Sequence, residues 1–173
     1  HLIGYVKYPS ADKAGVYYDE SYRAKDGVER SYDKLLSGKN GKKLVETSVD
    51  GTVTSESVQE LPQDGKTLTI SVDAKLTEKL FEAIAELAHN SGFVGGAGVI
   101  MNVLTGEILA LASYPEYDQN ALTYGVDQET FNKWINDPRT PFLNRAVGGL
   151  YTPGSILKPI VALAALNEKI IDP

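Results

Sequence analysis

Apolar side chains recur with two different periods between residues 67 and 92. From Thr67 to Val72 every second residue is apolar, and a period of two predicts a strand. After Asp73, which can cap a helix, apolar residues return at helical spacing until Ser91-Gly92, so this stretch predicts one amphipathic helix. The apolar face of that helix would be formed by Leu76, Leu80, Ile84 and Leu87.

Two apolar runs of strand length follow this helix. Val99 to Val103 and Glu107 to Ala112 are joined by Leu104-Thr105-Gly106, a short turn containing glycine, which predicts a hairpin. Because polar alternation is weak in both runs, we expect the hairpin to be largely buried, as the first pair of strands of a larger sheet. A glycine-rich stretch, residues 95–98, precedes it. No Gly-Lys-Ser/Thr ending follows, so nucleotide binding is not indicated.

Beyond the hairpin the pattern weakens. Asp127 to Asn136 predicts a short helix whose apolar face carries Phe131, Trp134 and Ile135. Arg139 to Leu150 shows little periodicity and predicts a loop, either packed beside a functional site or a plain surface connector. We expect Asn144 and Arg145 to fix this loop rather than to perform chemistry.

The first 66 residues are rich in Gly, Ser, Tyr and charge. Lys43 to Val49 and Thr52 to Thr54 alternate with period two, and Asp50-Gly51 between them indicates a tight hairpin. A short amphipathic helix is predicted at Val28 to Leu36. Turn-forming residues cluster at 61–66, so we divide the chain into a β-rich part, 1–66, and a second part, 67–173, of α+β class.

Composition narrows the classes of function. The chain has 173 residues, 42% of them hydrophobic and 23% charged, as is ordinary for a globular protein. A net charge of −6, with no basic cluster beyond Lys39 to Lys43, argues against nucleic-acid binding. There is no cysteine, and His1 and His89 lie far apart without carboxylates at metal-ligand spacing. We therefore expect no metal and no cofactor, and a surface position for His89.

Ser-x-x-Lys, a pattern that can pair a nucleophile with its base, occurs three times. Ser10 with Lys13 falls in a polar loop, and Ser31 with Lys34 is surrounded by charge. Ser155 with Lys158 stands between a Gly- and Pro-rich turn and the apolar run 160–166. Apolar neighbours disfavour a charged ammonium, and the free N–H groups of a helix N-terminus can stabilise an oxyanion.

Pro159 places the start of that helix. A proline there cannot donate to the carbonyl four residues earlier, that of Ser155, so the helix is predicted to begin at or near Ser155. Two helical side chains three residues apart share a face, so Ser155 Oγ and Lys158 Nζ can approach each other. From these residues alone, an ordinary N-terminal serine on a core helix, with Lys158 extended outward, remains an alternative.

Five blocks of the sequence resemble penicillin-binding proteins, in the order of that family. The segment 151–159, Tyr-Thr-Pro-Gly-Ser-Ile-Leu-Lys-Pro, resembles the first catalytic motif, for which Ser-x-x-Lys is a signature. Residues 98–115 resemble the stretch that opens the transpeptidase sheet, and residues 141–146 resemble the segment before the active serine. Residues 1–6 and 27–38 resemble the non-catalytic pedestal of the monofunctional, class B members.

The resemblance implies a β-rich pedestal followed by the first part of a transpeptidase domain related to serine β-lactamases. It implies a peptidoglycan D,D-transpeptidase in which Ser155 is the nucleophile and Lys158 the general base. A D-alanyl-D-alanine stem peptide would be the acyl donor, β-lactams would be covalent inhibitors, and other cell-wall synthesis proteins would be partners. It further implies the extracytoplasmic face of a bacterial membrane, with an anchoring segment upstream of His1.

Two expected motifs of the family, Ser-x-Asn and Lys-Thr-Gly, do not occur in the 173 residues. By resemblance they supply a proton-relay partner and carboxylate recognition, so we expect this chain by itself to be inactive. A non-catalytic scaffold or binding module of the same ancestry, or a β-lactam sensor, is the alternative. β-Lactamases and carboxypeptidases share Ser-x-x-Lys, but the pedestal-like blocks argue against both.

Overall fold

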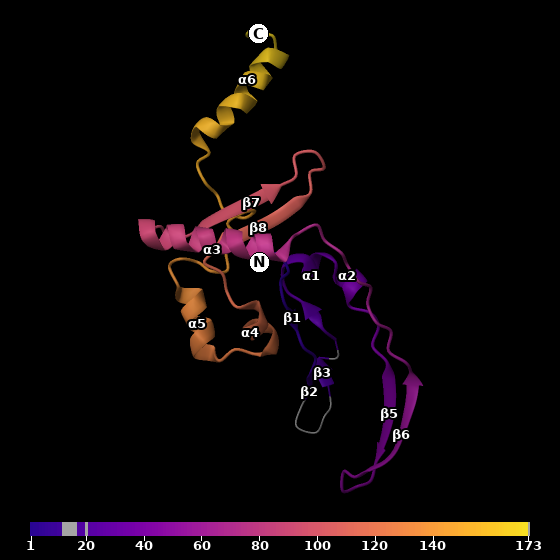
Figure 1. The fold of residues 1–173 in the computed structure, drawn as a ribbon. Helices are drawn as coiled ribbons and strands as arrows, with labels where there is room; N and C mark the ends of the chain where they lie inside the picture. The colour runs from indigo at the N-terminus through magenta and orange to yellow at the C-terminus, as the bar shows by residue number, and fades with distance from the viewer. Residues whose placement is uncertain (12–16, 20, 173) are drawn as a thin grey trace.

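The computed structural model describes residues 1–11, 17–19 and 21–172 (Figure 1). Its first part contains four short strands, two short helices and a longer hairpin. Antiparallel pairs are formed by β1 (Val6–Lys7) with β4 (Arg23–Ala24), β2 (Ser10–Ala11) with β3 (Tyr17–Asp19), and β5 (Lys42–Thr47) with β6 (Val53–Glu60). The helices are α1 (Gly27–Ser31) and α2 (Asp33–Leu36).

The hairpin predicted around Asp50-Gly51 is confirmed as β5–β6. Gly51 has φ +83°, a left-handed conformation that suits glycine, and its N–H donates to the Ser48 carbonyl over 2.9 Å. Every residue of both strands is exposed, and the hairpin extends away from the rest of the molecule (Figure 1). The helix predicted at 28–36 is present as two short helices separated at Tyr32.

The amphipathic helix predicted after Asp73 is confirmed as α3 (Ala74–Ser91). The Asp73 carboxylate accepts from the Leu76 N–H over 2.9 Å, and Gly92 ends the helix with φ +69°. α3 packs across the hairpin of β7 (Gly96–Met101) and β8 (Ile108–Tyr114), the two strands predicted there (Figure 1).

Glycines in β7 permit this close packing. A Cβ at Gly98 would lie 3.0 Å from Leu80 Cδ1 and 3.1 Å from Ile84 Cδ1, closer than ordinary van der Waals contact. Leu80 and Ile84 belong to the predicted apolar face of α3, so the helix meets β7 through those two side chains. On β8 the same contact buries Ala110 and Ala112 completely or nearly so.

The prediction of a strand from Thr67 to Val72 is wrong. This segment forms no ladder with a neighbouring strand; the Lys66 N–H donates to the Leu35 carbonyl before it, and the Asp73 N–H to the Leu109 carbonyl after it. Alternation of apolar residues makes an extended segment amphipathic, but a strand also needs a partner along its whole length. Here the segment links the two parts of the chain.

Burial of the β7–β8 hairpin is one-sided, so the prediction of a largely buried hairpin is only half correct. α3 covers one face, where Ala110 and Ala112 lie. On the opposite face Val99 and Met101 remain 46% and 52% exposed. The weak polar alternation is therefore explained by a second face that stays open at Val99 and Met101, although Ser113 on the same face is buried.

Two helices follow β8, namely α4 (Gln119–Tyr124) and α5 (Gln128–Asn136), the second of which was predicted. Asp127 caps α5 by accepting from the Thr130 N–H over 2.9 Å. Phe131 and Trp134 of α5 direct their rings toward Phe142, at centroid distances of 6.2 and 6.5 Å, whereas Ile135 is exposed. The loop after α5 thus packs on the predicted apolar face through one aromatic side chain.

The chain continues into a short 3-10 helix, η1 (Gly154–Leu157), and then α6 (Lys158–Asn167). Figure 1 shows α6 extending away from the other elements. Its apolar side chains are open to solvent; Ile160 and Val161 are each 62% exposed. In the described part of the chain, no helix combines the length and apolarity needed to cross a membrane.

Candidate active site

Ser155 lies in η1, and Lys158 is the first residue of α6, so the structure places the predicted pair where a turn becomes a helix. The Lys158 backbone N–H donates to the Ser155 carbonyl, the acceptor that Pro159 cannot serve. A 3-10 turn at the start of an α-helix satisfies that carbonyl. The predicted helix start at or near Ser155 is therefore confirmed.

The side chains of the pair are both exposed. Among the described residues, neither the Ser155 hydroxyl nor the Lys158 ammonium forms a hydrogen bond or an ion pair, and no bond joins one to the other. Ile156 and Leu157, between them in sequence, are 76% and 43% exposed. The apolar surroundings expected for the lysine are therefore not supplied by the described residues.

The other two Ser-x-x-Lys pairs differ in their surroundings. The Ser31 hydroxyl donates to the Gly27 carbonyl over 3.0 Å within α1, while Lys34 belongs to the next helix, α2. The Ser31 hydroxyl is thus occupied by a hydrogen bond to the backbone of its own helix. Lys13, the partner of Ser10, lies outside the described residues.

Arg145 organises the loop that leads to Ser155, as the sequence predicted. Its side chain is only 7% exposed. Nη1 donates to the carbonyls of Thr140 and Leu143, each over 3.3 Å, and Nη2 donates to Thr140 Oγ1 over 3.1 Å and to the Arg139 carbonyl. One guanidinium therefore holds the loop from 139 to 145 in a single curved conformation.

The loop is fastened to the sheet by Ser113 of β8, a residue that is 1% exposed. The Ser113 hydroxyl donates to the Leu143 carbonyl over 3.2 Å and accepts from the Arg145 backbone N–H over 3.0 Å. Within the loop, Asn144 Oδ1 accepts from the Ala146 N–H over 3.1 Å. Asn144 and Arg145 thus fix the loop, and Ser113 joins the loop to β8. In the sequence, this loop precedes the segment that carries Ser155.

Sequence reasoning missed a buried cluster around Tyr117, which joins the first part of the chain to the second. The Tyr117 hydroxyl donates to Asp26 Oδ2 over 2.9 Å, across 91 residues of sequence. The ring stacks on Phe142 at 4.9 Å and meets His1 and Tyr5 edge-on at 5.0 and 5.8 Å. Its only sequence signal was a tyrosine in an aromatic- and proline-containing loop, which does not identify a partner.

Burial dominates the electrostatics of this cluster. It raises the pKa of Tyr117 above its ordinary value, and the hydrogen bond to the Asp26 carboxylate raises it further. Burial lowers the pKa of the His1 imidazole, an effect opposed in part by the Pro141 backbone carbonyl and by Asp26. At neutral pH both side chains are therefore uncharged. In the described residues, no group of three His, Asp or Glu side chains is placed to hold a metal ion.

Two family models match the chain in sequence order. Residues 1–70 match the penicillin-binding protein dimerisation domain, and residues 96–173 match the penicillin-binding protein transpeptidase domain. The second match includes Ser155 and Lys158, and the first includes Asp26. The chain belongs to the class B penicillin-binding proteins.

Relatives and solved structures agree with this assignment. The peptidoglycan D,D-transpeptidase MrdA of Escherichia coli K12 is 34% identical over 99% of this chain, and that of Acinetobacter baumannii is 33% identical over 99%. A peptidoglycan synthase complex that coordinates polymerization and crosslinking matches with TM-score 0.74 and 33% identity, over 99% of this chain and 32% of that one. The Helicobacter pylori penicillin-binding protein PBP2, in complex with MreC, matches with TM-score 0.68 and 33% identity over 96% and 31%.

The chain spans 27% of the length of the Escherichia coli relative and 25% of the Acinetobacter one. The α+β fold, with a dimerisation pedestal before the start of a transpeptidase domain, is confirmed by the family models and the structural matches. The division of this penicillin-binding protein chain into a first part, 1–66, and a second part, 67–173, stays a prediction.

Proposed function

We propose that the complete protein containing this chain is a peptidoglycan D,D-transpeptidase that works through an acyl-enzyme on Ser155. The observation that carries the proposal is the position of Ser155-x-x-Lys158 at a helix start inside the stretch that matches the transpeptidase domain. Relatives covering 99% of the chain are named peptidoglycan D,D-transpeptidases. No cofactor is needed for acyl transfer by serine.

In the proposed reaction, Ser155 Oγ attacks the carbonyl carbon between the two D-alanines of a stem peptide while neutral Lys158 takes its proton. The negative charge that develops on the carbonyl oxygen is stabilised by backbone N–H donors, with that of Ser155 as one of them. The bond to the terminal D-alanine breaks, its amine receives a proton, and an ester on Ser155 remains. An amine of a second stem peptide then displaces Ser155 and forms the cross-link.

The anchored loop supports this proposal from the structural side. Arg145 and Ser113 fix residues 139–145 against β8. The part of the chain that continues to Ser155 therefore starts from a fixed point beside the sheet. Positioning of a nucleophile within ångströms is worth orders of magnitude in rate. The apolar neighbours that would keep Lys158 neutral must come from residues beyond those described, so we propose that this chain alone is inactive.

Labelling of the complete protein with a fluorescent penicillin tests the proposal. We expect Ser155→Ala to abolish the covalent label, because no oxygen is left to be acylated. Lys158→Met should slow labelling by about 10²- to 10⁴-fold, the usual contribution of a general base. Ser31→Ala, at a matched Ser-x-x-Lys, should label like the wild type. Labelling that survives Ser155→Ala would show that Ser155 is not the nucleophile.

The non-catalytic alternatives are separated by a second readout on the same protein. A transpeptidase consumes a D-alanyl-D-alanine donor and releases D-alanine, whereas a β-lactam sensor takes the penicillin label without turnover and a scaffold does neither. D-Alanine release that disappears in Ser155→Ala identifies the enzyme. Labelling without release identifies the sensor.

We further propose that the complete protein acts at the extracytoplasmic face of the bacterial membrane, held by a segment upstream of residue 1. Its substrate would be found there. The solved complex of PBP2 with MreC supports partners among cell-wall synthesis proteins. Fractionation of cells producing the tagged complete protein, and recovery of its partners, would test both statements.

A further inference from the structure

A series of contacts runs from the pedestal to the stretch that carries Ser155. It starts at Asp26, which precedes α1 and accepts from the Tyr117 hydroxyl over 2.9 Å. Among the described residues of α1, none donates an amide to the Asp26 side chain, so the carboxylate serves Tyr117 rather than its own helix. The Asp26 carbonyl accepts from the Arg30 N–H over 3.1 Å, and a Cβ at Gly4 would overlap that carbonyl. Asp26 is therefore packed within the pedestal and moves with it.

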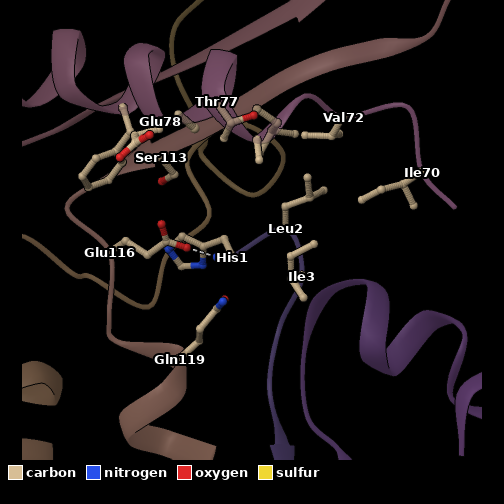
Figure 2. A pocket seen from close by; sticks show the side chains of 14 residues that line it. His1, Leu2, Ile3, Ile70, Val72, Thr77, Glu78, Ser113, Glu116 and Gln119 are labelled. Carbon is tan, nitrogen blue, oxygen red and sulfur yellow. Dashed lines mark ion pairs between the residues drawn. The ribbon is translucent and has the colours of Figure 1, made fainter. Parts of the chain in front are cut away.

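Beside this bond the two parts of the chain border a pocket of about 470 Å³ (Figure 2). Its wall includes residues of the first part and of the stretch that carries Tyr117, among them Leu2 and Ile3 from the first part and Ser113, Glu116 and Gln119 from the second. The pocket keeps those side chains apart, whereas Tyr117 and Asp26 are in direct contact. A movement of the pedestal therefore reaches this stretch of the second part at Tyr117.

Tyr117 in turn contacts the loop that follows α5. Its side chain is 4% exposed, and its ring stacks on Phe142 at a centroid distance of 4.9 Å and an interplanar angle of 23°. Phe142 lies within the loop that the Arg145 guanidinium and the Ser113 hydroxyl hold against β8. Because closely packed side chains transmit displacements, a shift of the Tyr117 ring displaces Phe142 and the loop.

The same loop continues into the segment before Ser155. A Cβ at Gly149 would lie 2.8 Å from the Arg145 carbonyl oxygen, so glycine lets the chain fold back onto the residue that anchors the loop. That Cβ would also overlap the ring of Tyr151. Packed contacts thus extend from the loop to Tyr151, four residues before the proposed nucleophile.

We propose that Tyr117 is a positioning residue through which the pedestal sets the rate at which Ser155 is acylated. The proposal rests on the proposed function, because it assigns to Tyr117 an effect on that reaction. Contacts with Asp26 and Phe142 hold the loop in the place from which Ser155 is presented. When these contacts loosen, Ser155 occupies a wider range of positions, of which fewer are productive. The chemical step then slows, whereas noncovalent binding is unchanged.

Acylation kinetics of the complete protein test the proposal. Labelling by a fluorescent penicillin is followed at several concentrations, which gives the noncovalent dissociation constant and the acylation rate constant separately. We expect Tyr117→Phe and Asp26→Ala each to lower the rate constant about 3- to 10-fold and to leave the dissociation constant within about twofold; a tenfold effect corresponds to about 1.4 kcal/mol, no more than one hydrogen bond to a charged group supplies. In the double variant the rate constant should fall no further, because both changes remove one bond.

Asp73→Ala is the matched control for stability. It removes the N-cap hydrogen bond of α3, which is not among these contacts, and its expected cost in stability is similar. At a temperature well below the thermal midpoint, we expect this variant to be acylated like the wild type. Equal slowing in Asp73→Ala would show that lost stability alone accounts for the effect and would overturn the proposal. The proposal is also overturned by an unchanged rate constant in Tyr117→Phe or Asp26→Ala, or by a change confined to the dissociation constant.

Hydrogen exchange at Gly148 reports on the loop without the reaction. Its N–H donates to the Asn144 carbonyl over 2.7 Å, so this amide exchanges when the loop opens. We expect Tyr117→Phe and Asp26→Ala to speed the exchange about 3- to 10-fold and Asp73→Ala to leave it unchanged. If the wild type takes no label, or if Ser155→Ala keeps it, the proposed function fails, whereas faster exchange still supports positioning of the loop by Tyr117. Unchanged exchange at Gly148 overturns the proposal in either case.

Discussion

Replacing Tyr117 by Phe removes one hydroxyl and tests the contact between the pedestal and the transpeptidase part. That hydroxyl donates to Asp26 Oδ2 over 2.9 Å, while the ring packs on Phe142, His1 and Tyr5. Phenylalanine keeps the ring and its contacts, so the change isolates the hydrogen bond. We expect the segment His1–Ile3 and α1 to separate from each other more often.

The magnitude follows from the acceptor and its surroundings. A hydrogen bond to a charged group contributes about 1.5–3 kcal/mol to stability. Asp26 is only half-buried, so water partly replaces the lost hydroxyl, and we expect a cost of about 1–2 kcal/mol. In Asp26→Ala/Tyr117→Phe the two losses should overlap, because each single variant removes the same bond, and the coupling should be about 1 kcal/mol. Tyr117→Ala also removes the ring contacts and should cost about 3–5 kcal/mol.

Native-state hydrogen exchange on the complete protein measures this opening locally. The amides of Val28 and Glu29, which follow Asp26, donate to the Leu2 and Ile3 carbonyls over 2.9 and 3.0 Å, so their exchange reports on how firmly the bond from Tyr117 holds the start of α1 against residues 1–3. A loss of 1–2 kcal/mol should speed their exchange about 5- to 30-fold. Tyr32→Phe, at an exposed tyrosine, serves as the matched control. Unchanged exchange in Tyr117→Phe would show that the bond to Asp26 does not hold the start of α1 in place.

Three further outcomes are expected. The pKa of Tyr117 is raised above 10.0 in the folded state, so its neutral hydroxyl contributes fully to stability below pH about 10. That contribution is lost as the pH rises further, because the unfolded chain ionises first. The fall in thermal midpoint above pH ~10 should therefore be shallower in Tyr117→Phe. Asp73→Ala removes the N-cap of α3 and should cost about 0.5–2 kcal/mol, seen as a lower thermal midpoint. Gly98→Val forces α3 away from β7 and should cost about 1–3 kcal/mol by the same measurement, whereas Ala97→Val, whose side chain is exposed, should change stability by less than about 0.5 kcal/mol.

Elements whose signals are local could be predicted from the sequence. α3 was predicted because its N-cap, its apolar period and its terminal glycine all lie within twenty residues, and each acts on the backbone beside it. The β5–β6 hairpin was predicted for the same reason, since Gly51 supplies the turn. The segment 67–72 shows the limit of such reasoning: its alternation is real, but whether a strand forms depends on a neighbour that the pattern does not name.

Contacts between distant residues could not be predicted. Nothing near Tyr117 indicates Asp26, and nothing near His1 indicates that its imidazole is buried beside α3 rather than exposed at a chain end. Arg145 was expected to fix its loop, but its attachment to β8 through Ser113 depends on a residue 32 positions earlier. The junction around Tyr117 arises from the packing of two parts that were predicted separately.

The candidate active site depends both on local signals and on contacts between distant residues. The position of Ser155 at a helix start is local, follows from Pro159, and is confirmed. The environment that makes a serine reactive is not local, because it requires apolar side chains around Lys158, and α6 instead presents Ile160 and Val161 to solvent. Burying such side chains contributes about 1.5–3 kcal/mol each, so the packing that would set the reactivity of Ser155 would also stabilise α6. Reactivity toward penicillin and protection of the α6 amides from hydrogen exchange should therefore appear together in the complete protein and be absent together from this chain; a labelled chain with exposed α6 amides would refute the link.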